Sequence, residues 1–430
     1  MPQAKNTAPA SAVLEPNGED RVLDAFRRWG YLQADLDPLG FLKPEPNAEL
    51  DISGEAAQQA RRFYCGTIGA EFAHIVQPER RRWIQERMEA PAPRFDQNRI
   101  LERLASAELF EQVLQARYLG TKRFSLEGLT VLVPLLDEIL DRAAEHNAEE
   151  IVLGMSHRGR LNVMVHTVGR NPEEIFAGFE DVDPRSVLGS GDVKYHMGAT
   201  GFYTAANGRQ IHIHLVSNPS HLEAVDPVTI GRTLAKQVRA GEDGAAKYLP
   251  ILLHGDGAFA GQGVWAETLN MSGLRGFSVG GTVHIIVNNL LGFTTKPSEL
   301  HTARFAADLA RRQSVPIFHV NGEDPDAVLR AGQMALEYRY EFGSDVVVDV
   351  IGYRRHGHSE VDDPTITQPL LYRAIKDHPP LWKIYAEDTG IDADPLVEKI
   401  RANFEAAHKR AAEITKKPLM RELPNYWDAY

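Results

Sequence analysis

The stretch over residues 248–292 constrains the fold of this chain more than any other. It contains two apolar runs, over 248–253 and 282–287, and each run is long enough for a buried strand. The first run leads into a Gly-Asp-Gly turn, with a helix predicted from about Val264, and the second run ends in two asparagines. Two such strand ends would meet at one crevice, which is where open α/β sheets bind their ligands.

The polar residues at these two strand ends offer oxygen atoms to a cation. Asp256 has a carboxylate, Asn289 has an amide, and a backbone carbonyl follows at Leu291. Mg²⁺ takes six oxygens, usually one or two carboxylates with phosphates, carbonyls and water in the other positions. Gly257 and the glycines near it let backbone N–H groups approach a phosphate at a helix start. We therefore predict a diphosphate held by magnesium, although each motif alone is also typical of an ordinary turn.

Composition limits the classes of function that remain. The 430 residues are 43% hydrophobic and 25% charged, as in soluble globular proteins. The net charge of −12 argues against nucleic acid as the main partner, because binding it needs a basic surface. No apolar run reaches the length of a membrane span, and a single cysteine suits a reducing compartment. Since no secretory signal is evident, we expect a cytoplasmic protein, or a mitochondrial matrix protein in a eukaryote.

Four segments are predicted along the chain. Residues 1–18 are rich in Ala, Pro, Asn and Ser, which predicts a disordered tail. Residues 19–120 carry apolar residues at helical spacing and predict a helical N-terminal region. Strand and helix patterns alternate over 121–385, which predicts an α/β domain with a mainly parallel sheet and helices on both faces. Residues 386–430 predict a helical C-terminal linker segment.

The strands predicted for the α/β domain are near-continuous apolar runs, as expected for strands that are buried on both faces. Besides the two described above, the predicted strands lie at 151–155, 210–216, 316–320 and 345–353. The predicted helices between the strands lie at 125–146, 161–168, 227–240, 303–312 and 325–342.

Two clusters with histidine and arginine follow predicted strands. Residues 154–160 carry His157 and Arg158 at the start of a helix. An arginine in that place can pair with a phosphate, and the histidine can face a substrate. Residues 353–360 carry His358 after the last predicted strand. A basic helix start is the alternative interpretation of the first cluster.

Two polar loops complete the candidate motifs. Residues 191–198 include His196 in a loop that has too many hydrogen-bonding groups for a simple linker. Residues 217–223 carry Ser220 and Leu222 directly after a predicted strand. Both loops would lie near the crevice predicted from the first two strands.

Together these motifs resemble the dehydrogenase (decarboxylating) component of the 2-oxoglutarate dehydrogenase complex. The similar phrases are HRGRLNV, GDVKYHMG, NPSHLEAVDPV, HGDGAFAGQG, VNNLLGFTT, PIFHVNGEDP and RRHGHSEVDDP. They occur in the order of that family, and the resemblance extends from about Arg21 to the C-terminus. GDG followed about thirty residues later by NN is also similar to the thiamine-diphosphate motif. The resemblance therefore implies the thiamine-diphosphate-binding fold.

The resemblance also implies a role for each motif. The implied Mg²⁺ ligands are Asp256, Asn289 and the carbonyl of Leu291. The implied contacts to thiamine diphosphate come from Arg158, Ser220, Leu222, Asp256, Gly257, Ala258 and Asn289. The residues implied to face the 2-oxo acid and the reacting centre are His157, His196 and His358.

The implied activity is the oxidative decarboxylation of 2-oxoglutarate, with succinyl transfer to the lipoyl group of dihydrolipoamide succinyltransferase, as in the tricarboxylic acid cycle. Two enzymatic alternatives remain open, a 2-oxoadipate dehydrogenase and a 2-oxoglutarate decarboxylase or carboligase. A third alternative is a cofactor-binding half that is inactive alone.

Two departures from the family pattern affect these expectations. The family commonly has GDA where this chain has Gly257, a smaller residue that removes no ligand. Family members are also about twice as long, and their second half supplies a glutamate beside the aminopyrimidine of the cofactor. This chain has no evident counterpart of that half. We therefore expect a second half-chain that carries the pyrimidine domain, or a homodimer in a full-length enzyme.

Overall fold

The computed structural model describes residues 18–180 and 193–414. The predicted tail 1–18, apart from its last residue, and the end of the predicted segment 386–430 lie outside the described residues. One central sheet contains eight strands: β1 (Ile68–Glu71), β2 (Glu150–Met155), β3 (Ala199–Thr204), β4 (Gln210–Leu215), β5 (Tyr248–Gly255), β6 (Val283–Asn288), β7 (Ile317–Asn321) and β8 (Val346–Ile351).

The strand order is β1-β7-β8-β6-β5-β2-β4-β3. The inner strands pair in parallel, and only the outermost pairs, β1 with β7 and β3 with β4, are antiparallel. This arrangement confirms the predicted α/β class with a mainly parallel sheet. Parallel pairing brings the carboxyl ends of β2, β5, β6 and β8 to one edge, where the crevice was predicted.

Helices surround the sheet. The α-helices are α1 (Gly18–Trp29), α2 (Glu55–Tyr64), α3 (Pro78–Glu89), α4 (Gln97–Arg117), α5 (Leu132–Glu145), α6 (Arg160–His166), α7 (Pro172–Glu180), α8 (Val225–Ala240), α9 (Gly244–Lys247), α10 (Asp256–Gly261), α11 (Gly263–Met271), α12 (Pro297–Leu300), α13 (Pro325–Phe342), α14 (Pro369–Asp377), α15 (Leu381–Thr389) and α16 (Asp394–Ala411). The 3-10 helices are η1 (Gly30–Gln33), η2 (Ala48–Leu50), η3 (Val193–Tyr195), η4 (Gly241–Asp243) and η5 (Ala306–Arg312).

Both faces of the sheet are buried, which explains why its strands are apolar along their whole length. On β8, Val346, Val348 and Val350 belong to the larger core, which contains residues of α5 and α13. The alternate residues Val347 and Ile351 belong to a second core with residues of α10, α11 and η5. Side chains alternate between the two faces of a strand, so each face requires its own apolar set.

Local end signals account for the helices that were predicted well. The side chain of Asp324 accepts a hydrogen bond from the backbone N–H of Ala327, and proline occupies the first position of α13. The helix ends at Gly343, which has a positive φ of 56°. Side-chain caps of this kind satisfy N–H groups that the first turn leaves free, and glycine adopts the left-handed conformation at little cost.

Several elements differ from the prediction. β1 and β3 are short antiparallel edge strands that were not predicted, and β1 arises from the segment predicted as helical. The helix expected over 125–146 begins only at α5. Gly128 has a φ of 96°, and a Cβ atom there would lie 2.3 Å from the Tyr353 carbonyl, so close packing on the end of β8 keeps this segment in a loop. The boundaries at 120 and 385 stay predictions.

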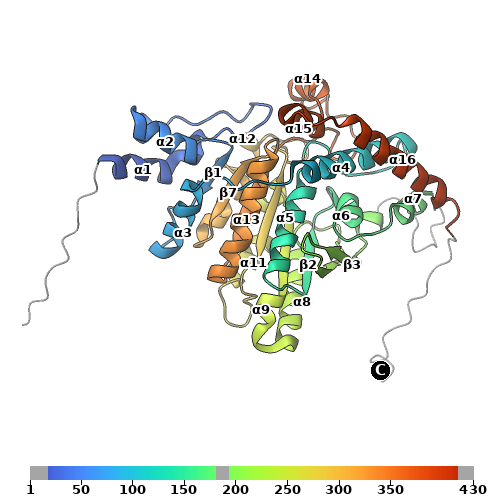
Figure 1. Ribbon diagram of the computed structural model, residues 1–430, viewed down its shortest axis with the longest axis horizontal. Helices are drawn as coiled ribbons and strands as arrows, with labels where there is room; N and C mark the ends of the chain where they lie inside the picture. Colours follow the sequence, from blue (N-terminus) through green and yellow to red (C-terminus); the bar gives the residue numbers. More distant parts are fainter. Residues whose placement is uncertain (1–17, 181–192, 415–430) are drawn as a thin grey trace, which may run out of the picture.

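The first and last helices lie at opposite ends of the molecule (Figure 1). Helices α1, α2 and α3 occupy the end beside β1, whereas α16 packs along α4 and α7 at the other end. Among the described helices, none is both long enough and apolar enough to cross a bilayer.

Candidate functional site

A cavity of about 480 Å³ lies at the carboxyl ends of the inner strands. It brings together every predicted site residue except His196. The lining residues are Lys122, Phe124, Ser156, His157, Arg158, Ser220, Leu222, Gly255, Asp256, Gly257, Ala258, Asn289, Leu291, Gly292, Phe293, Leu300, Arg354 and His358. Segments that are far apart in the sequence thus meet at one place, as the parallel sheet requires.

Asp256 and Asn289 lie side by side in this cavity. Asp256 opens α10 directly after β5, and its Oδ1 accepts a hydrogen bond of 3.2 Å from Asn289 Nδ2. Burial, with a smaller effect from the charge of Asp349, raises the pKa of Asp256 to about 6. The Oδ1 atom of Asn289 is buried and has no hydrogen-bond partner among the described residues. A carboxylate and a spare amide oxygen therefore lie in one cavity, and oxygen atoms of these types are the ligands that a hard cation requires.

Gly257 lies where two backbone segments approach closely. A Cβ atom at this position would lie 3.1 Å from the Cα of Gly292 and 3.4 Å from a methyl group of Leu300. An alanine, which the resemblance would favour, requires these neighbours to move by a few tenths of an ångström. The glycine therefore accompanies a tight approach between the turns after β5 and β6, and it leaves the start of α10 accessible to a ligand.

Two guanidinium groups line the cavity without a carboxylate partner. Arg158 donates from Nη1 to the Ser125 carbonyl at 2.9 Å and from Nη2 to the His358 carbonyl at 3.0 Å. Burial, followed by the charge of Arg354, lowers the pKa of Arg158 to about 10. The group therefore stays charged at neutral pH. Within residues 18–180 and 193–414, neither Arg158 nor Arg354 forms an ion pair, so the site has an excess of positive charge suited to an anion.

His157 and His358 both contact one aromatic ring. The centroid of the Phe124 ring is 5.3 Å from that of His157 and 5.6 Å from that of His358. Burial, together with the charges of Arg158 and Arg354, lowers the pKa of His358 to about 4. At neutral pH this imidazole is therefore neutral, with one ring nitrogen able to donate a hydrogen bond and the other able to accept one.

His196 contacts two residues of the cavity lining and is not part of the lining itself. Its Nε2 is 3.2 Å from Ser220 Oγ, and its ring centroid is 5.2 Å from that of His157. The structure thus connects His196 to two residues that line the cavity, but does not place it among them. Part of its loop, residues 191–192, lies outside the described chain.

A buried polar network supports the turn that carries the candidate metal ligands. His319 on β7 bonds Asp349 Oδ2 through Nδ1 at 2.7 Å and Glu71 Oε1 through Nε2 at 2.8 Å. Asp349 Oδ1 accepts a hydrogen bond from Asn288 Nδ2 at 2.9 Å, and Asn288 Oδ1 accepts one from the backbone N–H of Leu290 at 3.0 Å. The network therefore fixes the end of β6, where Asn289 follows.

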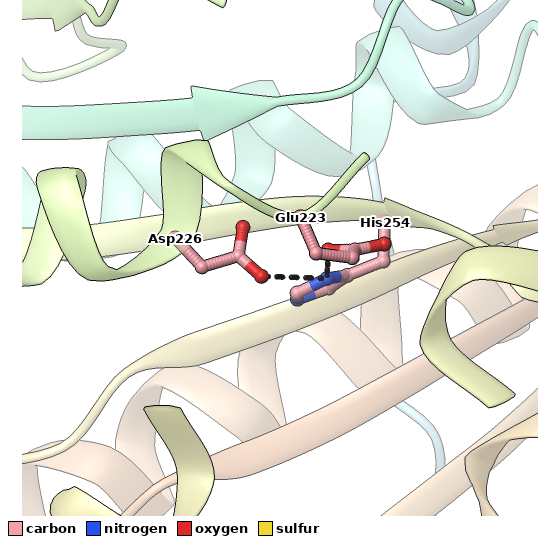
Figure 2. Close-up of side chains that lie close together, drawn as sticks. All are labelled: Glu223, Asp226 and His254. Atoms are coloured by element: carbon pink, nitrogen blue, oxygen red, sulfur yellow. Dashed lines mark hydrogen bonds and ion pairs between the residues drawn. The ribbon is translucent and has the colours of Figure 1, made fainter. Parts of the chain in front are cut away.

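A second buried network lies behind the loop that carries Ser220 and Leu222. Figure 2 shows Glu223 and Asp226 directed at His254 on β5. His254 Nδ1 is 2.6 Å from Glu223 Oε2, and its Nε2 is 3.1 Å from Nδ1 of the neighbouring histidine on β6, at position 284. Burial raises the pKa of Glu223 to about 7 and lowers that of His254.

Glu223, Asp226 and His254 are residue types that bind metal ions, but their spacing favours hydrogen bonding. Two ligand atoms about 2.1 Å from one tetrahedral ion are separated by about 3.4 Å. The distance of 2.6 Å between His254 and Glu223 is shorter and is that of a direct hydrogen bond. This cluster therefore joins the 217–223 loop to β5, two residues before Asp256.

Comparison with known proteins gives the family. Residues 102–422 match the family model described as "Dehydrogenase E1 component". The chain belongs to the dehydrogenase E1 component family. This membership confirms the resemblance found in the sequence motifs, and the mainly parallel sheet agrees with the thiamine-diphosphate-binding fold of E1 components.

One relative is a "Multifunctional 2-oxoglutarate metabolism enzyme" from Mycolicibacterium vanbaalenii. It is 43% identical over 403 residues, which cover 85% of this chain and 32% of the relative. The chain thus spans about a third of the length of that relative.

The residues of this E1 chain fit the cofactor that its family uses. Thiamine diphosphate brings negative charge and phosphate oxygens. The cavity offers two guanidinium groups that form no ion pair with a described residue, together with a carboxylate and an amide oxygen that has no described partner and could serve Mg²⁺. The volume of about 480 Å³ lies within the range of about 300–1,000 Å³ that is usual for small-molecule sites.

The structure adds lining residues that the sequence did not indicate. They are Lys122, Phe124, Ser156, Phe293, Leu300 and Arg354. Three of them lie in motifs that the sequence did mark, since Arg354 is in the cluster with His358, Ser156 in the cluster with His157, and Phe293 in the phrase VNNLLGFTT. The others come from loops and from the short helix α12, and no local pattern marks them because their positions depend on tertiary packing.

Proposed function

We propose that this chain binds the diphosphate end of thiamine diphosphate through Mg²⁺ and acts in the oxidative decarboxylation of 2-oxoglutarate. In this proposal the succinyl group passes to the lipoyl group of dihydrolipoamide succinyltransferase. The observation that carries the proposal is the placement of Asp256 beside Asn289, in a cavity with two guanidinium groups that have no carboxylate partner in the described part of the chain. The relative named for 2-oxoglutarate metabolism supports this choice of substrate.

The residues of the cavity divide between cofactor and substrate. Bound thiamine diphosphate supplies the electron sink that decarboxylation of a 2-oxo acid requires. Asp256, Asn289 and the Leu291 carbonyl hold Mg²⁺, and Arg158 offsets the charge of the diphosphate. The neutral imidazole of His358 can donate to or accept from the reacting groups of the substrate, because its pKa of about 4 keeps it unprotonated.

The composition of the cavity also supports the need for a second polypeptide segment. Asp256 is the only carboxylate in the lining that the structure describes, so the glutamate expected beside the aminopyrimidine must come from elsewhere. Leu222 is 43% exposed and Phe293 is 58% exposed at the same cavity. We propose that a pyrimidine-binding half-chain, or a second copy in a longer enzyme, covers these side chains. We place the reaction in the cytoplasm, or in the mitochondrial matrix of a eukaryote.

Calorimetric titration with thiamine diphosphate tests the cofactor assignment. We expect the chain to bind thiamine diphosphate in the presence of Mg²⁺ and to lose at least about 100-fold in affinity in Asp256→Asn, because the only carboxylate ligand is removed. The isosteric amide keeps the side-chain volume and can still pair with Asn289, so it isolates the loss of charge. Equal affinity in the two proteins, or binding that is independent of Mg²⁺, would contradict the metal site.

Activity is tested after the missing half has been supplied. We expect 2-oxoglutarate-dependent ferricyanide reduction only when a polypeptide with the pyrimidine-binding domain is added. Turnover of 2-oxoadipate in its place would identify the alternative substrate, and carbon dioxide release without lipoyl acylation would identify a decarboxylase. Full activity of the isolated chain would reject the need for a second segment.

His196 provides a test of substrate recognition. Since it reaches the cavity through Ser220 and His157, we expect His196→Ala to lower 2-oxoglutarate turnover by about 10- to 100-fold in the completed enzyme. Thiamine diphosphate affinity should stay within about threefold of the wild type. Loss of cofactor affinity with normal substrate saturation would instead assign His196 to the cofactor.

A further inference from the structure

Arg354 is a buried cation with an unused donor at the ligand cavity. It follows β8, is only 4% exposed and lines the cavity. Its Nε donates to the His356 carbonyl at 3.0 Å and to the Tyr372 hydroxyl at 3.2 Å, and its Nη2 donates to the Phe293 carbonyl at 3.0 Å. Its Nη1 is buried and has no partner among the residues that the structure describes. Arg354 is therefore held in place by neutral acceptors, with one nitrogen left over.

Among the residues that the structure describes, no carboxylate forms an ion pair with Arg354. Its three bonded acceptors are carbonyl and hydroxyl oxygens, and Asp256 is the only carboxylate in the described lining of the cavity. The nearby guanidinium of Arg158 adds a second positive charge, and the pKa of Arg158 is lowered in part by Arg354. A buried charge is costly unless an opposite charge or hydrogen bonds compensate it. Two guanidinium groups, with Lys122 as a third cationic side chain and Asp256 as the one carboxylate in the described lining, thus favour an anionic ligand.

The position of Arg354 selects one part of such a ligand. The carbonyl that accepts from Nη2 belongs to Phe293, two residues beyond Leu291, whose carbonyl is a candidate metal ligand. Arg354 therefore braces the turn that completes the metal site. The ligand group nearest to this turn under the proposed function is the diphosphate that shares the Mg²⁺ ion.

We propose that Arg354 is a second diphosphate-binding arginine. In this role Nη1 donates to a diphosphate oxygen, Nη2 holds the 291–293 turn through the Phe293 carbonyl, and Nε donates to the His356 carbonyl. The inference rests on the proposed function and assigns to Arg354 a role that complements that of Arg158. A planar guanidinium suits both tasks, because its nitrogens point in fixed and different directions.

Titration with inorganic pyrophosphate and Mg²⁺ tests this role without thiamine or catalysis. We expect Arg354→Lys, which keeps the charge but loses the fork of donors, to bind magnesium pyrophosphate about 10- to 100-fold more weakly than the wild type. Arg355→Lys is the matched control. The guanidinium of Arg355 donates to the carbonyls of Ile375 and His378 and does not line the cavity, so its variant should bind like the wild type.

Separate results identify separate failures. Wild-type affinity for magnesium pyrophosphate in Arg354→Lys would overturn the inference, even if thiamine diphosphate binds as proposed. A change confined to 2-oxoglutarate saturation in the completed enzyme would also overturn it and assign the guanidinium to the substrate carboxylate. A third result is also possible, in which the wild type does not bind thiamine diphosphate but the variant binds pyrophosphate more weakly than the wild type does. This result would support the role of Arg354 and reject the proposed function.

A crystal structure of the wild type with magnesium pyrophosphate keeps the test independent of how well the variant folds. We expect Arg354 Nη1 within about 3.2 Å of a diphosphate oxygen. A separation beyond about 4 Å, with the ligand bound at Asp256, would overturn the inference.

Discussion

Two groups of buried polar side chains differ in how completely their hydrogen-bonding atoms are paired. In the network around His319, both ring nitrogens bond carboxylates, and Asp349 also accepts from Asn288. In the cavity, Arg354 Nη1 and Asn289 Oδ1 have no partner among the described residues. Buried polar groups in proteins are nearly always satisfied, so an incomplete set at a cavity indicates a place for a ligand. The paired network supports the fold, and the unpaired group supports binding.

The same comparison extends to the protonation of two buried histidines. His319 lies between two carboxylates. Burial opposes its charge, but the bonds to Asp349 and Glu71 outweigh burial and raise its pKa to about 9. His254 Nδ1 lies 2.6 Å from Glu223 and 3.7 Å from Asp226, two carboxyl groups whose own pKa values burial raises, and its Nε2 faces another histidine. Burial lowers the pKa of His254 and outweighs the opposing charge of Asp226. The partners, rather than burial alone, thus decide whether a buried histidine is charged.

The largest expected effect comes from removing the centre of the paired network. His319→Leu leaves Glu71 and Asp349 buried without their cation, and we expect the free energy of unfolding to fall by about 3–5 kcal/mol. Denaturant unfolding measures the change. His214→Leu, on the half-exposed side of β4, is the control and should change stability by less than about 1 kcal/mol. A small effect at His319 would show that the network is not a structural support.

The pH dependence of stability follows from the same residue. The pKa of His319 is about 9 in the folded protein, above the ordinary value of 6.5, so folding tightens proton binding. The resulting stabilisation is complete below pH 6.5 and is lost as the pH rises through 9. We expect the stability difference between the wild type and His319→Leu to shrink by about 3 kcal/mol between pH 6 and pH 10. A constant difference would contradict a charged His319.

A matched pair of substitutions distinguishes the two histidine networks with a smaller effect. Hydrogen bonding to His319 outweighs burial and lowers the pKa of Glu71, whereas burial raises that of Glu223 to about 7. At pH 6 we expect Glu71→Gln to cost about 2–4 kcal/mol and Glu223→Gln less than about 1 kcal/mol, because glutamine resembles a protonated carboxyl group. Thermal unfolding of both variants checks this order, and equal losses would remove the distinction.

Local patterns were sufficient to predict the strands that carry Asp256 and Asn289. Their apolar runs are continuous because both faces of the sheet are buried, and the polar residues that interrupt the runs mark the strand ends. The short antiparallel strand β1 had no such pattern. It forms only because it pairs with β7, about 250 residues later in the chain, and tertiary pairing decides the structure of such short segments.

Tertiary packing also explains which features of the site the sequence did not predict. Arg354 and Arg355 are adjacent and chemically identical, yet one lines the cavity and the other bonds carbonyls near the end of α14. His319 lies within an apolar run, and its partner Glu71 is 248 residues away. His196 was expected to face the substrate, and its contact with Ser220 depends on how a loop packs. The orientations of these side chains cannot be predicted from the sequence, because they arise from contacts between distant segments.

The most direct measurement compares the stability of the wild type and Asp256→Asn without and with ligand at pH 8. Without ligand, we expect the variant to be more stable by about 1–3 kcal/mol, because burial raises the pKa of the Asp256 carboxyl to about 6 and its charge opposes folding above that pH. With Mg²⁺ and thiamine diphosphate at about 1,000 times the dissociation constant of the wild type, the wild type should gain about 4 kcal/mol. The variant, which binds at least about 100-fold more weakly, should gain at most about 1.4 kcal/mol, so its stability advantage should fall by at least about 2.7 kcal/mol. If the variant were less stable in both conditions, or if ligand stabilised both proteins equally, the unpaired charges of the cavity would not be a cofactor site.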